Sequence, residues 1–195
     1  MAADPRDAFH ASLIGQTTGS SDFDLNPEVV LPPERFLRPA AVLVVYQMVS
    51  QVPYLVLTKR ASALKLHPGQ IAFPGGKCDD ADQDVTQTAQ REAWEEIGLA
   101  PDEVEILGHL PPHETVTGFS VTPVLGWVNS DFVPIAAKRE VAEVFKVPLG
   151  HVINLDNYLV QSRRWRGQWR HYYTVPYGPY YIWGATAYIL RRIIG

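Results

Sequence analysis

The chain has 195 residues, of which 46% are hydrophobic and 19% are charged, so it is long enough to bury a core and too apolar to be disordered. Its formal net charge of −4 gives no reason to expect nucleic acid or an anionic membrane surface as a partner. The single cysteine, Cys78, excludes an internal disulfide framework and favours a reducing compartment. We therefore expect a cytoplasmic protein.

The first 35 residues are rich in Asp, Ser and Pro, and they predict an N-terminal arm with one short helix over 5–13. They lack the apolar core of a signal peptide, and no run in the chain approaches the roughly 18 apolar residues that span a bilayer. Residues 36–195 are expected to form a single folded domain.

The domain opens with strand signals. The apolar run 40–48 predicts a buried strand, 51–53 a turn and 54–60 a returning strand, so this part of the chain is expected to be a hairpin. A further short strand over 70–73 is ended by Pro74 and two glycines.

Helix and strand signals alternate downstream. A helix over 84–98 is expected to end at Gly98, a residue type that favours the position after a helix. The remaining predictions are strands over 104–110, 121–128 and 141–149, a short helix over 149–155, a hairpin over 158–175 turning at Gly167, and a closing helix over 182–194. This order predicts an α/β (α+β) sandwich, with a mixed sheet covered by helices on both faces.

The predicted helix carries three carboxylates on one stripe, because Glu92, Glu95 and Glu96 are spaced i, i+3 and i+4. A solvated acidic surface is the simplest interpretation of such a cluster. Two costs argue against it: Glu92 and Glu96 are like charges at i+4, and acids in the last helical turn oppose the helix dipole. A divalent cation would offset both costs, and oxygen ligands suit Mg²⁺ or Mn²⁺.

A second stripe on the same helix, Ala89, Ala93 and Ile97, is apolar and is expected to dock on the sheet. Just upstream, Gly75 and Gly76 form a doublet whose backbone can approach a cation or ligand closely. A carbonyl of this doublet could complete a coordination sphere; a simple turn is the alternative.

The helix and the doublet together resemble the signature of the Nudix family, G-x5-E-x7-R-E-U-x-E-E-x-G-U, in which U is bulky and apolar. Ala93 stands at a U position, and upstream the register fails by one residue. The strict pattern would place glycine at Lys77 and glutamate at Gln83, and the nearest candidates are Gly76 and Asp82. The residues in register are Arg91, Glu92, Glu95, Glu96, Gly98 and Leu99.

The stretch LTKRASALKLHPGQIAFPGG, followed by an acidic linker with one extra residue, resembles the extended signature of the coenzyme A pyrophosphatase branch of that family, LLTxRSxxLxxHxGQxAFPGG. Ala61 stands where serine is common. The resemblance covers roughly residues 35–192.

The resemblance implies a Nudix α/β/α sandwich that hydrolyses CoA or acyl-CoA to 3′,5′-ADP and (acyl-)4′-phosphopantetheine. One alternative is a Nudix diphosphatase of another substrate, such as ADP-ribose, a dinucleotide or a damaged nucleotide. A ligand-binding module without activity is a third hypothesis, which the complete carboxylate set disfavours.

The resemblance also implies roles for individual residues. Glu92, Glu95 and Glu96 would be ligands of Mg²⁺ or Mn²⁺, assisted by a carbonyl of Gly75 or Gly76. Arg91 would orient a glutamate, with Glu95 at i+4 as the expected partner. A further acid from outside the signature is expected as ligand or base. The candidates, in order, are Glu140, Glu143 and Glu114.

Substrate contacts are expected from residues around the same turn. Lys59 and Arg60 could meet phosphates, and His67 and Gln70 belong to the extended signature, although His67 could equally cap or pack. The Gly-containing loop with Thr115 and Thr117 could lie over the substrate. Cys78 is expected to be a bystander thiol.

The segment 162–170 holds four arginines and two tryptophans and no acid. Aromatic and basic residues together can grip single-stranded nucleic acid, but the acidic total argues against it. In a hairpin, Arg164 and Arg166 are expected on the face opposite Trp165 and Trp169. The expected partner is a small-molecule substrate, with no nucleic acid and no membrane; a grip on a 3′-phosphate and a homodimer contact are left open.

Overall fold

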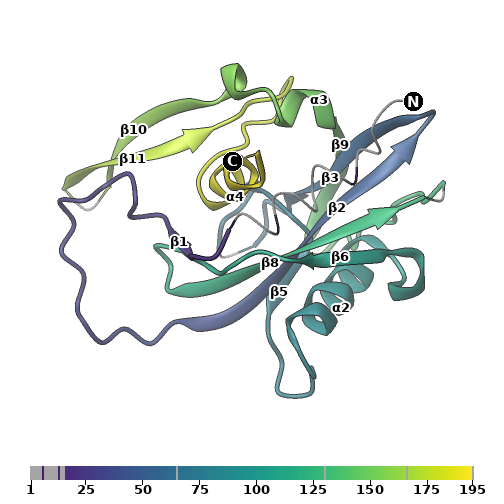
Figure 1. The fold of residues 1–195 in the computed structure, drawn as a ribbon, viewed down its shortest axis with the longest axis horizontal. Coiled ribbons are helices and arrows are strands. Elements are labelled where there is room, and N and C mark those ends of the chain that lie inside the picture. The colour runs from purple at the N-terminus through teal and green to yellow at the C-terminus, as the bar shows by residue number, and fades with distance from the viewer. Residues whose placement is uncertain are drawn as a thin grey trace.

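A computed structural model describes Arg6, Leu13 and residues 16–64, 66–129, 131–165 and 167–194 (Figure 1). The short helix predicted over 5–13 lies outside the described residues except for Arg6 and Leu13, so it stays a prediction. No helix within these ranges is long and apolar enough to cross a bilayer.

In the described part of the chain, nine strands form one mixed sheet with the order β1-β7-β8-β2-β3-β4, and β5, β6 and β9 pair with β2, β8 and β3. The central strand β2 runs parallel to β8 and antiparallel to β3. The strands are β1 (Ser20–Ser21), β2 (Arg38–Val49), β3 (Val52–Arg60), β4 (Ile71–Ala72), β5 (Gly75–Lys77), β6 (Glu105–His109), β7 (His113–Glu114), β8 (Phe119–Val128) and β9 (Val141–Pro148). The predicted mixed sheet is confirmed; β1, β5 and β7 were not predicted.

The turn of the β2–β3 hairpin differs from the prediction. It is formed by Ser50 and Gln51, which both have positive φ angles of 48° and 66°. Such angles at both central residues match the twist of the flanking strands. Val52 and Pro53 therefore belong to β3 and not to a turn over 51–53.

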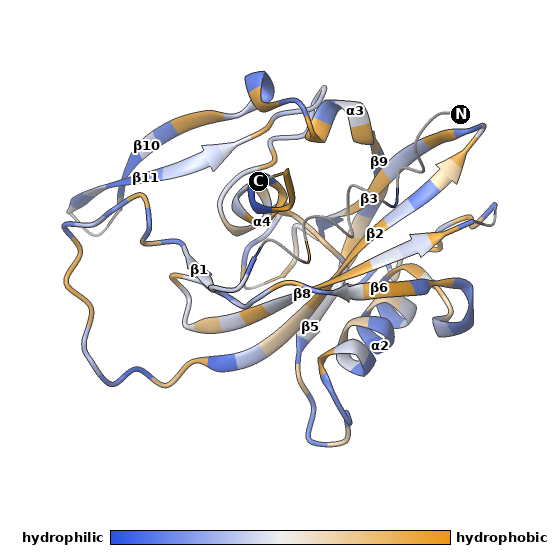
Figure 2. Cartoon of the chain, viewed as in Figure 1, coloured by the Kyte–Doolittle hydropathy of each residue, from blue (hydrophilic) through white to orange (hydrophobic). Residues whose placement is uncertain are grey.

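Helices cover both faces of the sheet, as predicted (Figure 1). On one face α2 (Val85–Ile97) packs on a cluster that includes Leu43 and Val56. On the other face α4 (Ala185–Ile194) joins a larger cluster. In Figure 2 hydrophobic colour runs along the strands between these helices, while α2 shows hydrophobic and hydrophilic residues in alternation, as expected of a helix that docks by one face.

The connection after β9 is less helical than predicted. The helix expected over 149–155 is shorter, with α3 (Leu149–Val152) followed by a 3₁₀ turn, η2 (Leu155–Asn157). Another 3₁₀ turn, η1 (Pro101–Glu103), follows α2.

The predicted hairpin is confirmed as β10 (Leu159–Trp165) and β11 (Gln168–Thr174), with Gly167 at φ 83° in the turn. The predicted separation of Arg164 from Trp169 is wrong, because the two residues pair directly, and the part of the prediction on Arg166 lies outside the described residues. Residues that lie directly opposite each other share a face, so Arg164 and Trp169 lie together, and both are exposed. The register depends on the number of residues in the turn, which alternation within one strand does not reveal.

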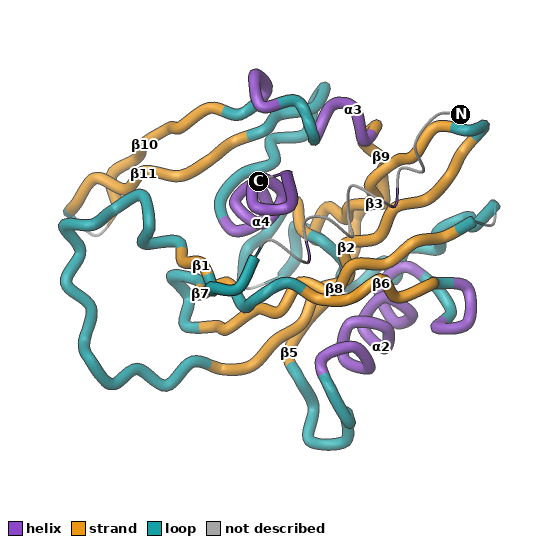
Figure 3. The backbone as a smooth tube through the Cα atoms, in the orientation of Figure 1, coloured by secondary structure: helices purple, strands orange, loops and turns teal. Residues whose placement is uncertain are grey.

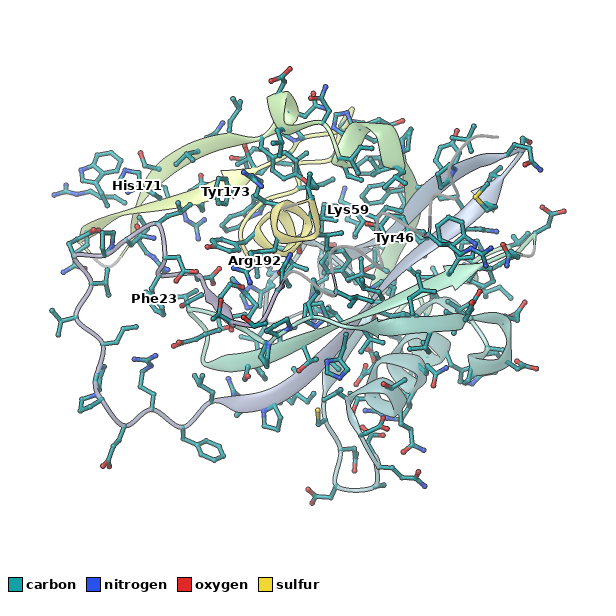
Figure 4. The ribbon with its side chains drawn as sticks, in the orientation of Figure 1. Phe23, Tyr46, Lys59, His171, Tyr173 and Arg192 are labelled. Carbon is teal, nitrogen blue, oxygen red and sulfur yellow. The ribbon has the colours of Figure 1, made fainter. Side chains whose placement is uncertain are left out.

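Residues 16–37 run as a long, mostly irregular segment along the domain before entering β2 (Figure 3). Asn26 is fully buried and joins this segment to β11: its Nδ2 donates to the carbonyls of Asp22 and His171, and its Oδ1 accepts from the His171 N–H at 2.7 Å. From α4, Arg192 donates to the carbonyl of Thr18 at 2.7 Å (Figure 4). These bonds tie the segment to the hairpin and to α4.

Candidate functional site

The helix α2 is fixed at both ends. The side chain of Asp84 accepts from the Gln87 N–H at 2.8 Å and so caps the first turn, and Gly98 ends the helix with φ 72°. Ala89, Ala93 and Ile97 are fully buried, which confirms the predicted docking stripe. Since these three residues hold one side of the helix on the sheet, its glutamates are directed toward β5 and the solvent.

Glu96 is the most deeply buried of the three carboxylates, at 4% exposure. It accepts a hydrogen bond of 3.2 Å from the Gly75 N–H. Burial raises the pKa of Glu96 to about 7, and the charges of Glu92 and Glu140 act in the same direction. Within the described ranges Glu96 forms no ion pair with a basic side chain. A buried carboxylate in this state favours either a proton or an added cation.

Glu92 lies against the glycine doublet. A Cβ atom placed on Gly76 would come within 2.4 Å of Glu92 Oε1, so any other residue here would displace this carboxylate from its position. Burial raises the pKa of Glu92, and Arg91 opposes the rise. The doublet is thus not a simple turn: it forms β5 and pairs with β2, where Ala41 lies opposite Gly76.

Arg91 connects the carboxylates to the linker before the helix. Its Nε and Nη2 donate to the two carboxylate oxygens of Asp82, both at 3.0 Å, and its Nη1 donates to Glu92 at 3.1 Å. The expected contact with Glu95 is present but longer, at 3.5 Å. Asp82 and Glu92, rather than Glu95, are therefore the main partners. Arg91 holds the pKa of the Asp82 carboxyl well below its usual range.

Glu140 and Arg60 also belong to this neighbourhood. The charge of Glu140, just before β9, raises the pKa of both Glu92 and Glu96, and that of Arg60 lowers the pKa of Glu96. A backbone hydrogen bond keeps Arg60 and Glu140 close to each other, because Ala61, the residue after Arg60, donates its N–H to the Glu140 carbonyl at 2.8 Å. The buried Nε of Arg60 has no hydrogen-bond partner among the described residues, so it can donate to a ligand.

A pocket of about 390 Å³ opens beside β3 and the loop before β4. Lys59, labelled near α4 in Figure 4, lines it together with the predicted His67 and Gln70. His67 has φ 55°, a region that residues other than glycine rarely adopt, and burial lowers its pKa, as does the charge of Arg60. The charge of Arg60 thus lowers the pKa of His67 in the pocket wall and that of Glu96. The lining residues are Lys59, His67, Pro68, Gly69, Gln70, Ile71, Pro179, Tyr180, Tyr181 and Trp183.

The aromatic part of this pocket was missed by the sequence analysis. Tyr180, Tyr181 and Trp183 come from the segment before α4, more than 100 residues after Lys59. The one available signal was aromatic density, with six aromatic residues between 172 and 183, and it carries no information about where they fold.

Several other predicted residues lie elsewhere. Thr115 and Thr117 hydrogen-bond to each other at 3.0 Å in the turn between β7 and β8 and do not line the pocket. Glu114 forms an ion pair of 2.7 Å with Arg35. Glu143 accepts a hydrogen bond from Tyr180. Of the three acids proposed from outside the signature, Glu140 alone has an electrostatic link to Glu92 and Glu96.

The donor set near β5 consists of carboxylate and carbonyl oxygens, which suits Mg²⁺ or Mn²⁺. Glu92 lies against Gly76, and Glu96 accepts a hydrogen bond from the Gly75 N–H. The side chain of Glu95 is 56% exposed and is directed toward Arg91. Among the described residues no three acidic, histidine or cysteine side chains are already gathered closely enough to hold a metal ion. Glu92 and Glu96 fit a cation in charge and chemistry, with the third position left to Glu95 or to Glu140.

Comparison with known proteins gives a consistent result. Residues 36–165 match the family model described as NUDIX domain. An uncharacterized Nudix hydrolase NudL from Enterobacter sp. (strain 638) is 44% identical over 156 residues, which cover 80% of this chain and 81% of that protein. A protein of the same name from Cronobacter sakazakii is 43% identical over the same share.

Solved structures share the fold. A MutT/nudix family protein from Enterococcus faecalis has a TM-score of 0.55 at 14% identity, covering 99% of this chain and 74% of that chain. A C. elegans Ap4A hydrolase in a binary complex has a TM-score of 0.51 at 22% identity, covering 60% of this chain and 84% of that one. At these identities the likeness concerns the arrangement of the sheet and helices.

Proposed function

The chain belongs to the Nudix hydrolase family, and from this premise we propose that it cleaves the diphosphate bond of CoA or acyl-CoA, releasing 3′,5′-ADP and (acyl-)4′-phosphopantetheine. One observation carries the choice of substrate. His67 and Gln70, which belong to the stretch that resembles the CoA branch, line the pocket next to β3, and Arg60, the residue of β3 that follows Lys59, shifts the pKa of both His67 and Glu96. We infer that the extended signature contacts the part of the substrate that extends from the diphosphate, and that the diphosphate itself lies at Glu92 and Glu96.

The carboxylates Glu92, Glu95 and Glu96, with a carbonyl of Gly75 or Gly76, would hold Mg²⁺ or Mn²⁺. When bound, such a cation neutralises charge on the diphosphate and lowers the pKa of a coordinated water. The support is the burial of Glu96, a carboxylate that forms no ion pair with any basic side chain in the described part of the chain.

The remaining residues would bind and orient. Arg60 is proposed to donate its unpartnered Nε to a phosphate oxygen, and Lys59 to add a positive charge at the mouth of the pocket. Glu140 would serve as the additional acid, either as a ligand or as the base that takes a proton from water. Arg91 would hold Glu92 and Asp82 in place and so act through them.

The proposal is tested with a panel of diphosphates, each with Mg²⁺ or Mn²⁺ and with products identified by mass. We expect CoA to yield 3′,5′-ADP, with dephospho-CoA, ADP-ribose and NADH turned over more slowly. Faster cleavage of ADP-ribose or NADH would move the assignment to another Nudix diphosphatase, and no turnover of any diphosphate would favour a binding module.

A further inference from the structure

The segment Pro179–Trp183 supplies a wall of the pocket that no signature residue provides. Within it, Tyr180 stacks on Phe145 of β9, with ring centroids 3.6 Å apart and planes 7° from parallel. Phe145 is itself part of the buried core. One face of the Tyr180 ring is therefore fixed against the core. The rest of the residue is available to line the pocket.

Two further interactions hold Tyr180 in position. Its hydroxyl donates to Glu143 Oε1 at 2.5 Å, and its backbone N–H and carbonyl both bond with Tyr177 at 2.9 Å. The hydrogen bond to Glu143 raises the pKa of Tyr180, so the hydroxyl stays protonated and remains a donor at neutral pH. The ring is thus a rigid surface formed before any ligand binds.

The other two rings of this wall already have partners from the β10–β11 hairpin. The guanidinium of Arg163 lies 4.4 Å above the Trp183 ring, and Tyr172 meets Trp183 edge-on at 5.2 Å. The hydroxyl of Tyr181 donates to Gln161 at 2.6 Å. The hairpin thereby supports the wall, whereas Tyr180 is held from the core side and makes no hydrogen bond or ring contact with the described residues of the hairpin.

A planar, polar ligand fits this combination of groups. Every nucleobase has a π face that stacks on an aromatic side chain. Beside Tyr180 the pocket offers the Gln70 amide, which can both donate to and accept from a base edge, and the Lys59 ammonium, which suits a phosphate. The pantetheine arm of CoA has no π face and would leave the aromatic surface without a stacking partner.

We propose that this pocket is the nucleobase subsite, in which the adenine of the substrate stacks on Tyr180 and Glu143 is a positioning residue for that ring. Glu143 is thereby removed from the list of candidate bases. The inference rests on the proposed function only in taking an adenine nucleotide as one half of the substrate.

The test compares Tyr180→Leu, Tyr180→Phe, Glu143→Gln and Glu143→Leu with the wild type. Trp169→Leu serves as a matched control, because it removes an exposed aromatic side chain on the hairpin, outside the pocket. Binding of 3′,5′-ADP and of 4′-phosphopantetheine is measured by calorimetry with Mg²⁺ present, and KM and kcat are measured for CoA. The melting temperature of each variant shows whether it is folded.

For Tyr180→Leu we expect the Kd of 3′,5′-ADP and the KM of CoA to rise about tenfold or more, with kcat changed less than about threefold. Tyr180→Phe keeps the ring and should lose less. Glu143→Gln keeps an acceptor for the tyrosine hydroxyl and should resemble the wild type, whereas Glu143→Leu should share the KM effect. A purely structural role for Glu143 would instead lower the melting temperature and leave KM unchanged.

The outcomes separate this inference from the proposed function. If CoA is not cleaved but Tyr180→Leu still weakens 3′,5′-ADP, the subsite stands and the substrate assignment fails. If CoA is cleaved and Tyr180→Leu weakens 4′-phosphopantetheine instead, or affects neither product, the nucleobase assignment is overturned. A loss of kcat at unchanged KM in Glu143→Gln would return Glu143 to the catalytic candidates.

Discussion

Gly76 and Glu92 share one space at the edge of the sheet: a Cβ atom on Gly76 would lie 2.4 Å from Glu92 Oε1 and 2.5 Å from its Cδ. The carboxylate occupies the volume that a side chain at position 76 would fill, so glycine allows Glu92 to take this position. The neighbouring Gly75 donates its N–H to Glu96, so the two glycines position two different carboxylates.

Gly76→Ala is expected to displace Glu92 and to lower kcat with CoA by about 10- to 100-fold, in the range seen when groups that support a metal ligand are removed. Gly150→Ala is the matched control, since a Cβ at Gly150 meets nothing within 4 Å and the residue lies in α3. Steady-state kinetics over a range of Mg²⁺ concentrations provides the measurement. Equal activity in the two variants would show that the position of Glu92 is unimportant.

Arg91→Lys is expected to lower activity by a similar factor, because a lysine cannot reproduce the two parallel hydrogen bonds to Asp82. Asp82→Asn should have a comparable effect, and the double variant should lose little more, since both changes break the same contact. The kinetics of the three variants form a cycle. Additive losses would mean that Arg91 and Asp82 act independently.

Glu96→Gln is expected to stabilise the metal-free protein at pH 8. The folded-state pKa of Glu96 is raised from 4.5 to about 7, so this residue's contribution to stability is fully present below pH 4.5 and is lost as the pH rises to about 7. The full effect corresponds to about 3 kcal/mol. Urea unfolding in EDTA at pH 5 and pH 8 measures it.

The control for this prediction is Glu95→Gln, whose exposed carboxylate should change the free energy of unfolding by less than about 0.5 kcal/mol. Added Mg²⁺ or Mn²⁺ should stabilise the wild type more than Glu96→Gln, because the variant lacks the buried charge. An unfolding free energy for Glu96→Gln that falls with pH as steeply as that of the wild type would contradict the assignment.

Asn26→Ala is expected to lower the free energy of unfolding by about 2–3 kcal/mol, because it leaves the backbone N–H and carbonyl of His171 without their partners. Glu28→Ala, at an exposed position of the same segment, should be neutral. Urea unfolding gives the difference in stability, and hydrogen exchange at the His171 amide shows whether the contact is lost. Unchanged protection of this amide would rule out the proposed role of Asn26.

The extent of α2 and the faces of its side chains could be predicted from the local sequence pattern. The spacing of Glu92, Glu95 and Glu96, the stripe of small and apolar residues opposite, and Gly98 at the end all depend on residues within one or two turns of each other. The periodicity of a helix fixes which of them share a side. For the same reason the long strands and the hairpin turning at Gly167 were predictable.

The sequence by itself determined the family, the order of the main elements and the carboxylate stripe, because these follow from local spacing and from signatures along the chain. Only the tertiary structure decided which groups meet: Glu92 on Gly76, Arg91 on Asp82, and Tyr180 against Phe145 at the pocket. The physical reason is that such contacts depend on strand register and on the packing of segments that lie far apart in the sequence, in places more than 100 residues.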